Sequence, residues 1–395
     1  MLRRMGRHFL PVVLAWSASL SSAAAQDEAP RDTGQSSAGA WQWEFDAHVV
    51  FGLNHQDRKF RDFTVWESQN WTMARGERAL GRTTVSVRSM VSLEPWTVRD
   101  IGSPQVFQTG ETFQGGALID YQHPHDLLMA AGGDIRLPVR DLAIVLGADL
   151  VGSPTLGPPA FMHRPSARLN PQSPLAHHHL DATHITPGVV RAGLEARAWR
   201  VEGSWFRGRE PDEDRVDVDL GALDSYAVRI GWSAGAWSAQ ASAGWLTKPE
   251  AVTPYDAKKL TASLSHSGAA VAWMLAFGQK REIHGNSEAY LFEATWRARR
   301  RDSIYTRVET VAKDILDVGF HPTGTFHRHR QSQVSAATAG YIRDLIQARA
   351  GVLGLGMDIT GYAVPSNLKA AYGSPISFHA FVIYRLRSSD SPHSH

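Results

Sequence analysis

The sequence predicts an all-β fold, a transmembrane antiparallel up-and-down β-barrel of about sixteen strands, with twelve or fourteen strands as alternatives. Three observations predict it. Apolar and polar residues alternate with a period of two through most of the chain. The breaks between alternating runs are short and long in turn, as in barrels with short periplasmic turns and long outer loops. After the N-terminus, no run approaches the roughly 20 apolar residues of a membrane helix, and a closed barrel is the other fold that satisfies its backbone in lipid.

The N-terminus is typical of an export signal. Arg3, Arg4 and Arg7 precede an apolar stretch at residues 9–20, and Ala23-Ala24-Ala25 offers a small-residue cleavage site. We therefore expect export to a bacterial outer membrane. The predicted division of the chain is a signal peptide (residues 1–25), a disordered periplasmic lead-in (26–40), the barrel (41–387) and a frayed C-terminal tail (388–395).

Alternation is clearest in six segments of roughly ten residues, the length of a membrane strand. In the first, Trp43, Phe45 and Phe51 share one face, and Glu44, Asp46 and His48 share the other. The other segments are residues 85–93, 142–150, 271–277, 290–297 and 378–387. Two weaker runs, residues 126–137 and 257–266, make the strand count uncertain by two to four.

The breaks between these runs fall into two classes. Short breaks lie near residues 138–141, 196–199, 233–237, 266–269, 298–302 and 341–344. Longer breaks lie near residues 54–62, 95–126, 152–183, 207–222, 247–256, 314–330 and 358–375. We expect the loops over 95–126 and 152–183 to close the mouth of the barrel in part.

A soluble β-sandwich or β-propeller is the alternative fold, because alternation alone does not say which face is inside. A propeller would show a repeat of about 40–50 residues, and the sequence has none. Tryptophans placed near the strand ends favour membrane interfaces instead. They are Trp41, Trp43, Trp66, Trp71, Trp96, Trp205, Trp232, Trp237, Trp245 and Trp296.

Composition excludes several functions. The chain has no cysteine, which removes disulfides, thiolate metal sites and cysteine nucleophiles and fits passage through an oxidising periplasm. Its formal net charge is +2, from 41 basic and 39 acidic residues, so no overall field points to nucleic acid. We expect contacts with outer-membrane lipid and lipopolysaccharide and with small solutes or metal ions, and the oligomeric state stays open.

The polar face of the predicted strands carries charges of both signs. Such charges can form salt-bridge networks that set the selectivity of a pore, or they can simply buttress the barrel interior. The predicted lumen-lining residues are Glu44, Asp46, His48, Arg88, Asp149, Glu202, Arg229, Glu293, Arg297, Arg307, Glu309 and His379.

The two longest loops are rich in histidine. Neutral imidazoles are good ligands for copper and zinc, and methionine favours Cu(I). The candidate metal ligands are Met162, His163, His177, His178, His179, Asp181 and His184, with His123 and His125 as companions. A later loop adds His321, His327 and His329. No zinc signature matches these spacings. The alternatives are an exposed loop that is merely His-rich, and a rigid loop folded into the barrel mouth as a plug.

Two motifs in this part of the chain carry a resemblance. The segment 157–167 (GPPAFMHRPSA) with 177–188, which begins HHHLDATHI, followed by 208–213 (GREPDE), is similar to a motif set of uncharacterised bacterial outer-membrane β-barrel proteins. That group is associated with gene neighbourhoods for copper and other heavy metals. The similarity covers about 60 of the 395 residues. It implies a metal-linked role in the cell envelope and assigns no residue a mechanism.

Other chemistry has weaker support. An outer-membrane lipase would need an activated serine, and the nearest string is His284-Gly285-Asn286-Ser287. Asp181 and His184 at the barrel mouth could imitate an outer-membrane protease. The acidic run at residues 210–214, with Asp217 and Asp219, predicts either a calcium site or a solvated loop tip.

Three functions therefore stand as hypotheses. The first is a channel or transport-associated barrel linked to transition metals through its His- and Met-rich loop. The second is a general porin without metal chemistry, and the third is a barrel enzyme that acts on lipid or peptide. We expect no enzymatic activity and no cofactor beyond a copper or zinc ion.

Overall fold

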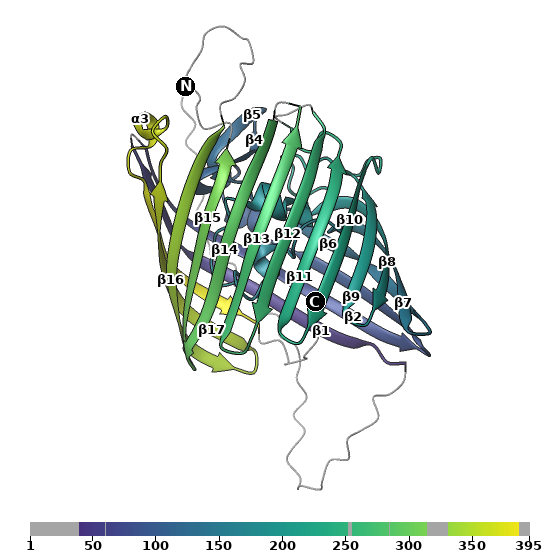
Figure 1. Cartoon of the computed structure of the whole chain (residues 1–395). Helices are drawn as coiled ribbons and strands as arrows, with labels where there is room; N and C mark the ends of the chain where they lie inside the picture. Colours follow the sequence, from purple (N-terminus) through teal and green to yellow (C-terminus); the bar gives the residue numbers. More distant parts are fainter. Residues whose placement is uncertain (1–38, 60, 252–254, 284, 314–330, 387–395) are drawn as a thin grey trace, which may run out of the picture. The chain divides into compact units, whose positions relative to one another are not determined.

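The computed structural model describes residues 39–386 except residues 60, 252–254, 284 and 314–330. The chain divides into the units Met1–Ala38 and Gly39–His395, and only the second contains described residues. The predicted signal peptide, most of the lead-in and the predicted tail lie outside them. In the second unit, sixteen antiparallel strands form one closed barrel, in the order β1-β18-β17-β16-β15-β14-β13-β12-β11-β10-β9-β8-β7-β6-β3-β2 (Figure 1). This confirms the predicted fold class.

The strands of the barrel and the segments between them follow the sequence in order. The first half contains β1 (Gln42–Arg58), β2 (Arg61–Leu80), β3 (Thr83–Val91), α1 (Glu94–Thr97), β4 (Ser103–Phe113), β5 (Gly116–Gln122), β6 (Leu128–Val139), β7 (Leu142–Gly152), the 3₁₀ helix η1 (Phe161–His163), α2 (His177–Leu180), the 3₁₀ helix η2 (Ala182–His184), β8 (Thr186–Ala196) and β9 (Trp199–Phe206). The second half contains β10 (Ser225–Ala234), β11 (Trp237–Leu246), β12 (Ala257–Ser267), β13 (Val271–Glu282), β14 (Gly285–Arg299), β15 (Asp302–Lys313), β16 (Ser332–Ala348), β17 (Gly351–Ala363), α3 (Lys369–Tyr372) and β18 (Ile376–Arg385).

The two ends of the barrel differ as the loop lengths predict. At the turn end, two or three residues connect successive strands, as between β6 and β7 or between β14 and β15. The opposite end, the loop end, carries the long connections, including those between β3 and β6 and between β7 and β8. The start of β1 and the end of β18 both lie at the turn end, because an even number of strands returns the chain there.

Two of the predicted breaks are wrong. Residues 54–62 do not form a long loop, because β1 continues to Arg58 and β2 begins at Arg61. The polar side chain of Asn54 points into the barrel instead, and its amide donates to Glu67 Oε1 at 2.9 Å. The predicted turn at 341–344 lies within β16, where Arg343 bonds to Asp302 of β15 at 3.0 Å. Polar residues within a strand resemble a loop when only composition is considered, whether they face the lumen, as Asn54 does, or are exposed, as Arg343 is.

The outer surface of the barrel is apolar. Exposed side chains there include Phe51, Leu146, Val228 and Leu275, and aromatic residues such as Trp66 and Trp205 accompany them. This pattern fits a surface that faces lipid. Trp71 is the exception among the predicted interfacial tryptophans, because it is buried and only 4% exposed. It lies five residues after Trp66, so the alternation places it on the inner face. No helix in the described part of the chain is long and apolar enough to cross a bilayer.

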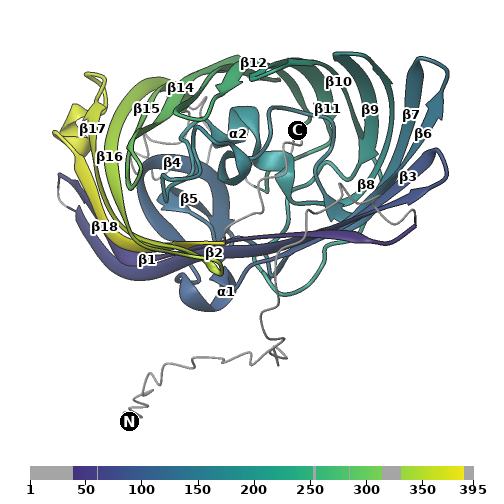
Figure 2. The same ribbon diagram turned by 90° about the horizontal axis from the view of Figure 1, so that it is seen from below.

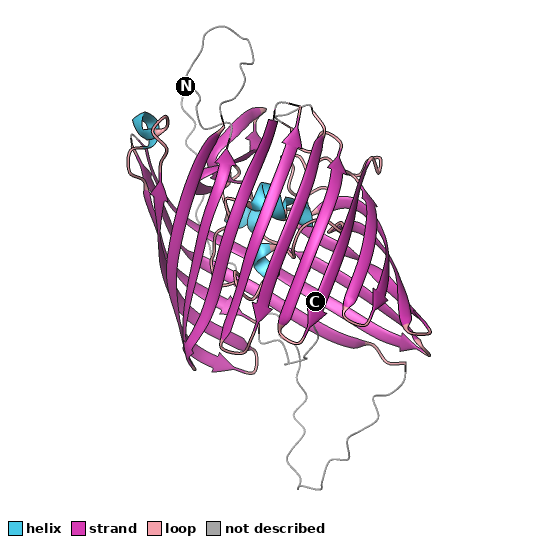
Figure 3. Ribbon diagram, in the orientation of Figure 1, coloured by secondary structure: helices cyan, strands magenta, loops and turns pink. Residues whose placement is uncertain are grey.

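Two segments fold into the barrel instead of extending away from it (Figures 2 and 3). One is the hairpin of β4 and β5, called here the inner hairpin. The other is the connection between β7 and β8, residues 153–185, called here the plug loop, which contains α2. Both pack against the barrel wall in one apolar cluster. It includes Val106 and Phe107 of the inner hairpin, Leu175, Ala176 and Leu180 of the plug loop, and Met274, Ala289 and Leu291 of the wall.

Candidate functional site

Arg164 anchors the plug loop to the barrel wall. This arginine is 3% exposed and follows η1 directly. Its Nε donates to Glu293 Oε1 of β14 at 2.6 Å, and its Nη1 donates to Asp181 Oδ2 at 2.6 Å. Burial alone would raise the pKa of Asp181, but Arg164 and His177 hold that pKa well below its usual range. One buried cation therefore serves two carboxylates, one from the plug loop and one from the wall.

Two glycines let the plug loop pack closely. Gly157 has a φ of +81°, and a Cβ there would lie 1.9 Å from the carbonyl oxygen of Leu180. Gly278 lies on the inner face of β13, where α2 packs against the barrel wall. A Cβ at Gly278 would lie 2.7 Å from the carbonyl oxygen of His179. Because neither residue has a side chain, α2 can lie directly against the wall.

The inner hairpin holds the same plug loop from the side. Gln105 Nε2 donates to the Ser173 carbonyl at 2.7 Å, and Gln172 of the plug loop donates to the Pro104 carbonyl at 3.0 Å. A cavity of only about 10 Å³ remains beside them, next to Arg307 and Glu309, about the room of one water molecule. Little space therefore remains between the plug loop and the barrel wall at this point.

Charged side chains of β3, β6, β7 and β8 form a cluster on the inner face of the barrel. Arg88 of β3 and Arg191 of β8 each bond to both Asp134 of β6 and Asp149 of β7, which forms a charge quartet. Gly147 makes room for it, because a Cβ there would lie 2.0 Å from Asp134 Oδ1. Beside the quartet, Arg229 and Arg200 share Glu202 at 2.7 Å each. Charges of opposite sign are therefore paired across neighbouring strands.

The predicted lumen residues take several positions. Arg88, Asp149, Glu202 and Arg229 belong to the paired charges just described. Glu293, Arg307 and Glu309 are buried against the plug loop, where the Ala176 amide donates to Glu309 at 3.1 Å. His379 is buried and bonds to Asp358 at 2.6 Å. Asp46 lies 3.5 Å from Arg168 of the plug loop. His48 is buried beside Trp71. Glu44 and Arg297 are exposed.

Five of the predicted metal ligands lie together, namely His125, His177, His178, Asp181 and His184. His125, from the loop before β6, lies 5.5 Å from His184, measured between ring centroids, and His184 lies 5.2 Å from His177. His178 adjoins His177 at 5.6 Å and approaches Glu210. Asp181 contacts this group directly, because its Oδ1 bonds to His177 Nδ1 at 2.8 Å. The plug loop buries all three consecutive histidines, so they do not form an exposed loop.

The other predicted ligands lie apart from this group. Met162 packs in an apolar cluster with Met90 and Met129, and His163 packs on Trp71 at 4.9 Å. His123 is half-buried two residues before His125. The later histidines His321, His327 and His329 lie outside the described residues.

His179 forms a pair that the sequence analysis did not predict. Its Nε2 lies 2.9 Å from Ser287 Oγ, inside the barrel. The Nδ1 of His179 is buried and has no hydrogen-bond partner in the described part of the chain. A serine nucleophile usually needs a histidine that a third polar group orients. The pair therefore lacks the third member of a hydrolase triad. His284, from the same sequence string, is outside the described residues.

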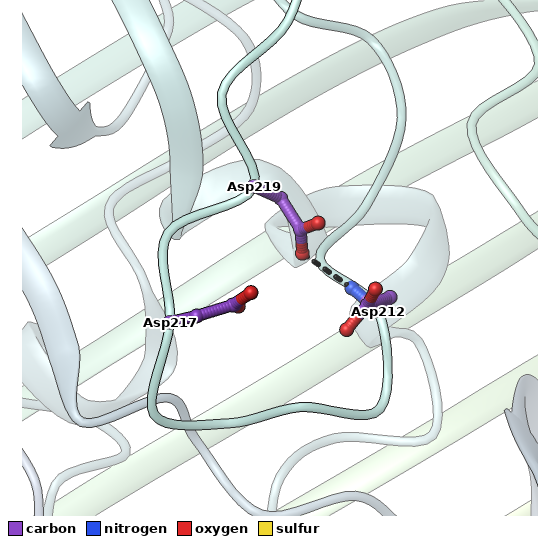
Figure 4. Close-up of side chains that lie close together, drawn as sticks. All are labelled: Asp212, Asp217 and Asp219. Carbon is purple, nitrogen blue, oxygen red and sulfur yellow. Dashed lines mark hydrogen bonds between the residues drawn. The ribbon is translucent and has the colours of Figure 1, made fainter.

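The acidic loop between β9 and β10 brings Asp212, Asp217 and Asp219 together (Figure 4). One carboxylate oxygen of each lies within 4.8 Å of the others, and the Asp212 amide donates to Asp219 at 2.8 Å. Asp212 and Asp217 are exposed. Calcium takes six to eight oxygen ligands, so three carboxylates on an exposed loop agree equally with a solvated tip.

Sequence reasoning missed Asp134, Arg164, Arg191 and Gly278, and also Glu94, whose Oε2 bonds to His125 Nδ1 at 2.9 Å. Asp134 and Arg191 lie on inner strand faces and could have been found by extending the alternation through the weaker runs. Glu94 and Arg164 act in loops, and Gly278 matters only because α2 lies against it. No local signal distinguishes those three.

Together these features define a sixteen-stranded transmembrane barrel of the porin fold with a loop folded into its lumen. Among solved structures, the chain is similar to an anion-selective porin from Comamonas acidovorans, with 11% identity, a TM-score of 0.51, and 88% of this chain and 100% of that chain covered. It is also similar to the outer membrane channel DcaP of Acinetobacter baumannii, with 10% identity, a TM-score of 0.51, and 89% of this chain and 99% of that chain covered. OprB of Pseudomonas putida is similar as well, with 10% identity, a TM-score of 0.52, and 88% of this chain and 94% of that chain covered. At these identities the likeness extends to the fold alone. The sequence matches no family model and no curated protein.

Proposed function

We propose that this protein is an outer-membrane channel for small solutes, with a conducting path that the plug loop restricts. One combination of features carries the proposal. The exterior of the barrel is apolar, the interior is lined by paired charges, and the plug loop folds inward and is held by an ion pair. The porins and channels of similar fold support it. The charged lumen sets which solutes enter, and the plug loop sets how much of the cross-section is open.

Bilayer conductance tests this proposal. In one variant, a short Gly-Ser linker replaces residues 154–184, which is feasible because Gly152 and Thr186 are paired neighbours on β7 and β8. We expect a measurable conductance for the intact barrel and a larger one for the variant. Heat-modifiable migration in gels reports whether each barrel has folded. If neither folded barrel conducts ions, the channel proposal is wrong.

Transition-metal handling is the second candidate, favoured by the meeting of His125, His177 and His184 inside the barrel. A general porin with no metal chemistry would share the same barrel and the same conductance, so the two candidates differ in metal affinity alone.

A further inference from the structure

Three imidazole rings meet where the plug loop touches the loop before β6. His177 begins α2, His184 ends η2, and His125 comes from the other loop. Their ring centroids are 5.2 Å apart for His177 and His184 and 5.5 Å apart for His184 and His125. Two imidazoles that share a tetrahedral metal ion, with metal–nitrogen bonds of about 2.0–2.1 Å, place their ring centres about 5 Å apart. The observed spacing of both pairs agrees with that geometry.

Each ring is oriented through the same nitrogen. His125 Nδ1 bonds to Glu94 Oε2 at 2.9 Å, His177 Nδ1 to Asp181 Oδ1 at 2.8 Å, and His184 Nδ1 to the Asp181 carbonyl at 2.9 Å. Carboxylates and carbonyl groups only accept hydrogen bonds, so each Nδ1 carries the proton. In the neutral form of each ring, the lone pair is then on Nε2. A carboxylate or carbonyl behind Nδ1 is the usual arrangement around metal-bound histidine.

The Nε2 atoms of these rings make no hydrogen bond with the described residues. His184 Nε2 is buried and has no hydrogen-bond partner in the described part of the chain. Every hydrogen bond that these three side chains make with described residues uses Nδ1. Burial lowers the pKa of both His177 and His184, which keeps these rings neutral and able to bind a metal ion.

We propose that His125, His177 and His184 bind one divalent transition-metal ion through their Nε2 atoms, an ion of the class that includes Zn²⁺ and Cu²⁺. Imidazole suits these ions, and Met162 packs in the apolar cluster with Met90 and Met129. Among the described residues, only the aspartate trio has all its ligand atoms within 4.8 Å. The three Nε2 atoms therefore have to turn toward one point when the ion binds. The ion links two loops and holds the plug loop in the lumen.

This inference goes beyond the channel proposal, because the site would exist in a conducting or a non-conducting barrel. The test uses the folded mature barrel in detergent. Zn²⁺ is titrated by calorimetry, and Cu²⁺ is added for electron paramagnetic resonance, which counts the coordinated nitrogens. We expect about one strongly bound ion with a micromolar or lower Kd, and a nitrogen pattern from three imidazoles.

His184→Ala and His125→Ala should each weaken binding at least tenfold. His379→Ala is the matched control, because the His379 Nδ1 also bonds to a carboxylate and its Nε2 is also buried without a partner in the described structure. That variant should bind like the parent protein. Equal affinity in all variants would overturn the site and assign the binding to histidines elsewhere in the chain. No binding at about 100 μM Zn²⁺ would also overturn it.

A second readout does not depend on the alanine variants folding. The chain has no cysteine, so Ala176→Cys introduces a single thiol at a position in the plug loop that is fully buried. Zn²⁺ should slow labelling of this thiol at least tenfold if the ion holds the plug loop. Labelling that Zn²⁺ leaves unchanged contradicts the proposed link between the loops. Conductance measured in the presence of a chelator, which removes metal ions, tests the channel proposal separately. The metal site and the channel can therefore each be refuted without the other.

Discussion

Arg164 is the single side chain on which the docking of the plug loop depends most. It neutralises Asp181 and Glu293, which are both almost fully buried. The substitution Arg164→Met keeps most of the side-chain volume but leaves two buried carboxylates without their shared cation. Breaking a buried ion pair in this way costs about 3–5 kcal/mol. We expect the labelling rate of Ala176→Cys to rise on the order of a hundredfold or more in the Arg164→Met background.

The control for this prediction is Arg136→Met. Arg136 bonds to Glu195 at 2.7 Å, but its side chain is 48% exposed, and exposed pairs contribute about 0–1 kcal/mol. Labelling in this background should stay close to that of the parent. Similar rates in the two backgrounds would show that Arg164 does not anchor the plug loop.

The buried histidines predict how pH affects the plug loop. Burial lowers the pKa of His177, His179 and His184 below the usual value of about 6.5. A docked plug loop therefore binds fewer protons than a released one, and docking weakens as the pH falls below about 6.5. His125 is the exception among these four histidines. Burial lowers its pKa, but Glu94 outweighs burial and raises it, so His125 alone among them opposes the effect.

We therefore expect conductance to increase as the pH is lowered from about 7 to 5. His184→Asn removes one of the rings and should flatten this dependence. A conductance that is constant or decreases over this range would contradict the assignment of neutral histidines to the docked state.

At the scale of elements, the approach of α2 to the barrel wall depends on Gly278 of β13. A methyl group there would press on the backbone of His179, because the added Cβ would lie 2.7 Å from the His179 carbonyl oxygen. Overpacking of this kind costs about 1–3 kcal/mol. Gly278→Ala should accelerate labelling of Ala176→Cys about tenfold. Gly361→Ala in β17 is the control, because a Cβ there has no neighbour within 4 Å. Equal rates for the two variants would contradict the close contact.

At the scale of the whole molecule, the charge quartet is predicted to set ion selectivity. Asp149 is fully buried between Arg88 and Arg191, and Asp149→Asn leaves these arginines with only Asp134. One unpaired positive charge interacts with an ion 4 Å away in water with an energy of about 1 kcal/mol. An energy of this size changes the permeability of an ion several-fold. The reversal potential in a salt gradient should shift toward anion selectivity.

Asp62→Asn is the matched control for selectivity, because the Asp62 side chain at the loop end is 65% exposed and salt screens its charge. It should leave the reversal potential unchanged. A shift of the same size in both variants would mean that the quartet does not line the conducting path.

The sequence by itself determined the barrel. Alternation is a local property, since successive side chains of a strand point to opposite faces, so the inner and outer faces could be assigned from residues such as Phe51 and His48. Loop lengths then fixed the strand order and the two unlike ends. The break predicted at residues 54–62 failed because polar residues such as Asn54 face the lumen, and composition alone does not separate a loop from an inward-facing strand. At residues 341–344 the charged residues Arg343 and Asp344 resembled a turn, although β16 continues to Ala348.

Only the tertiary structure decided what the long loops do. Arg164 meets Glu293 across 129 positions of sequence, and His125 meets His184 across two separate loops. These contacts depend on how the closed barrel confines the loops, and no periodic pattern encodes them. The sequence could propose metal ligands by residue type, but it offered no means of separating His125, His177 and His184 from Met162, His163 and His179. Their roles differ because burial and hydrogen-bond partners, rather than residue type, decide which nitrogens remain available to bind an ion.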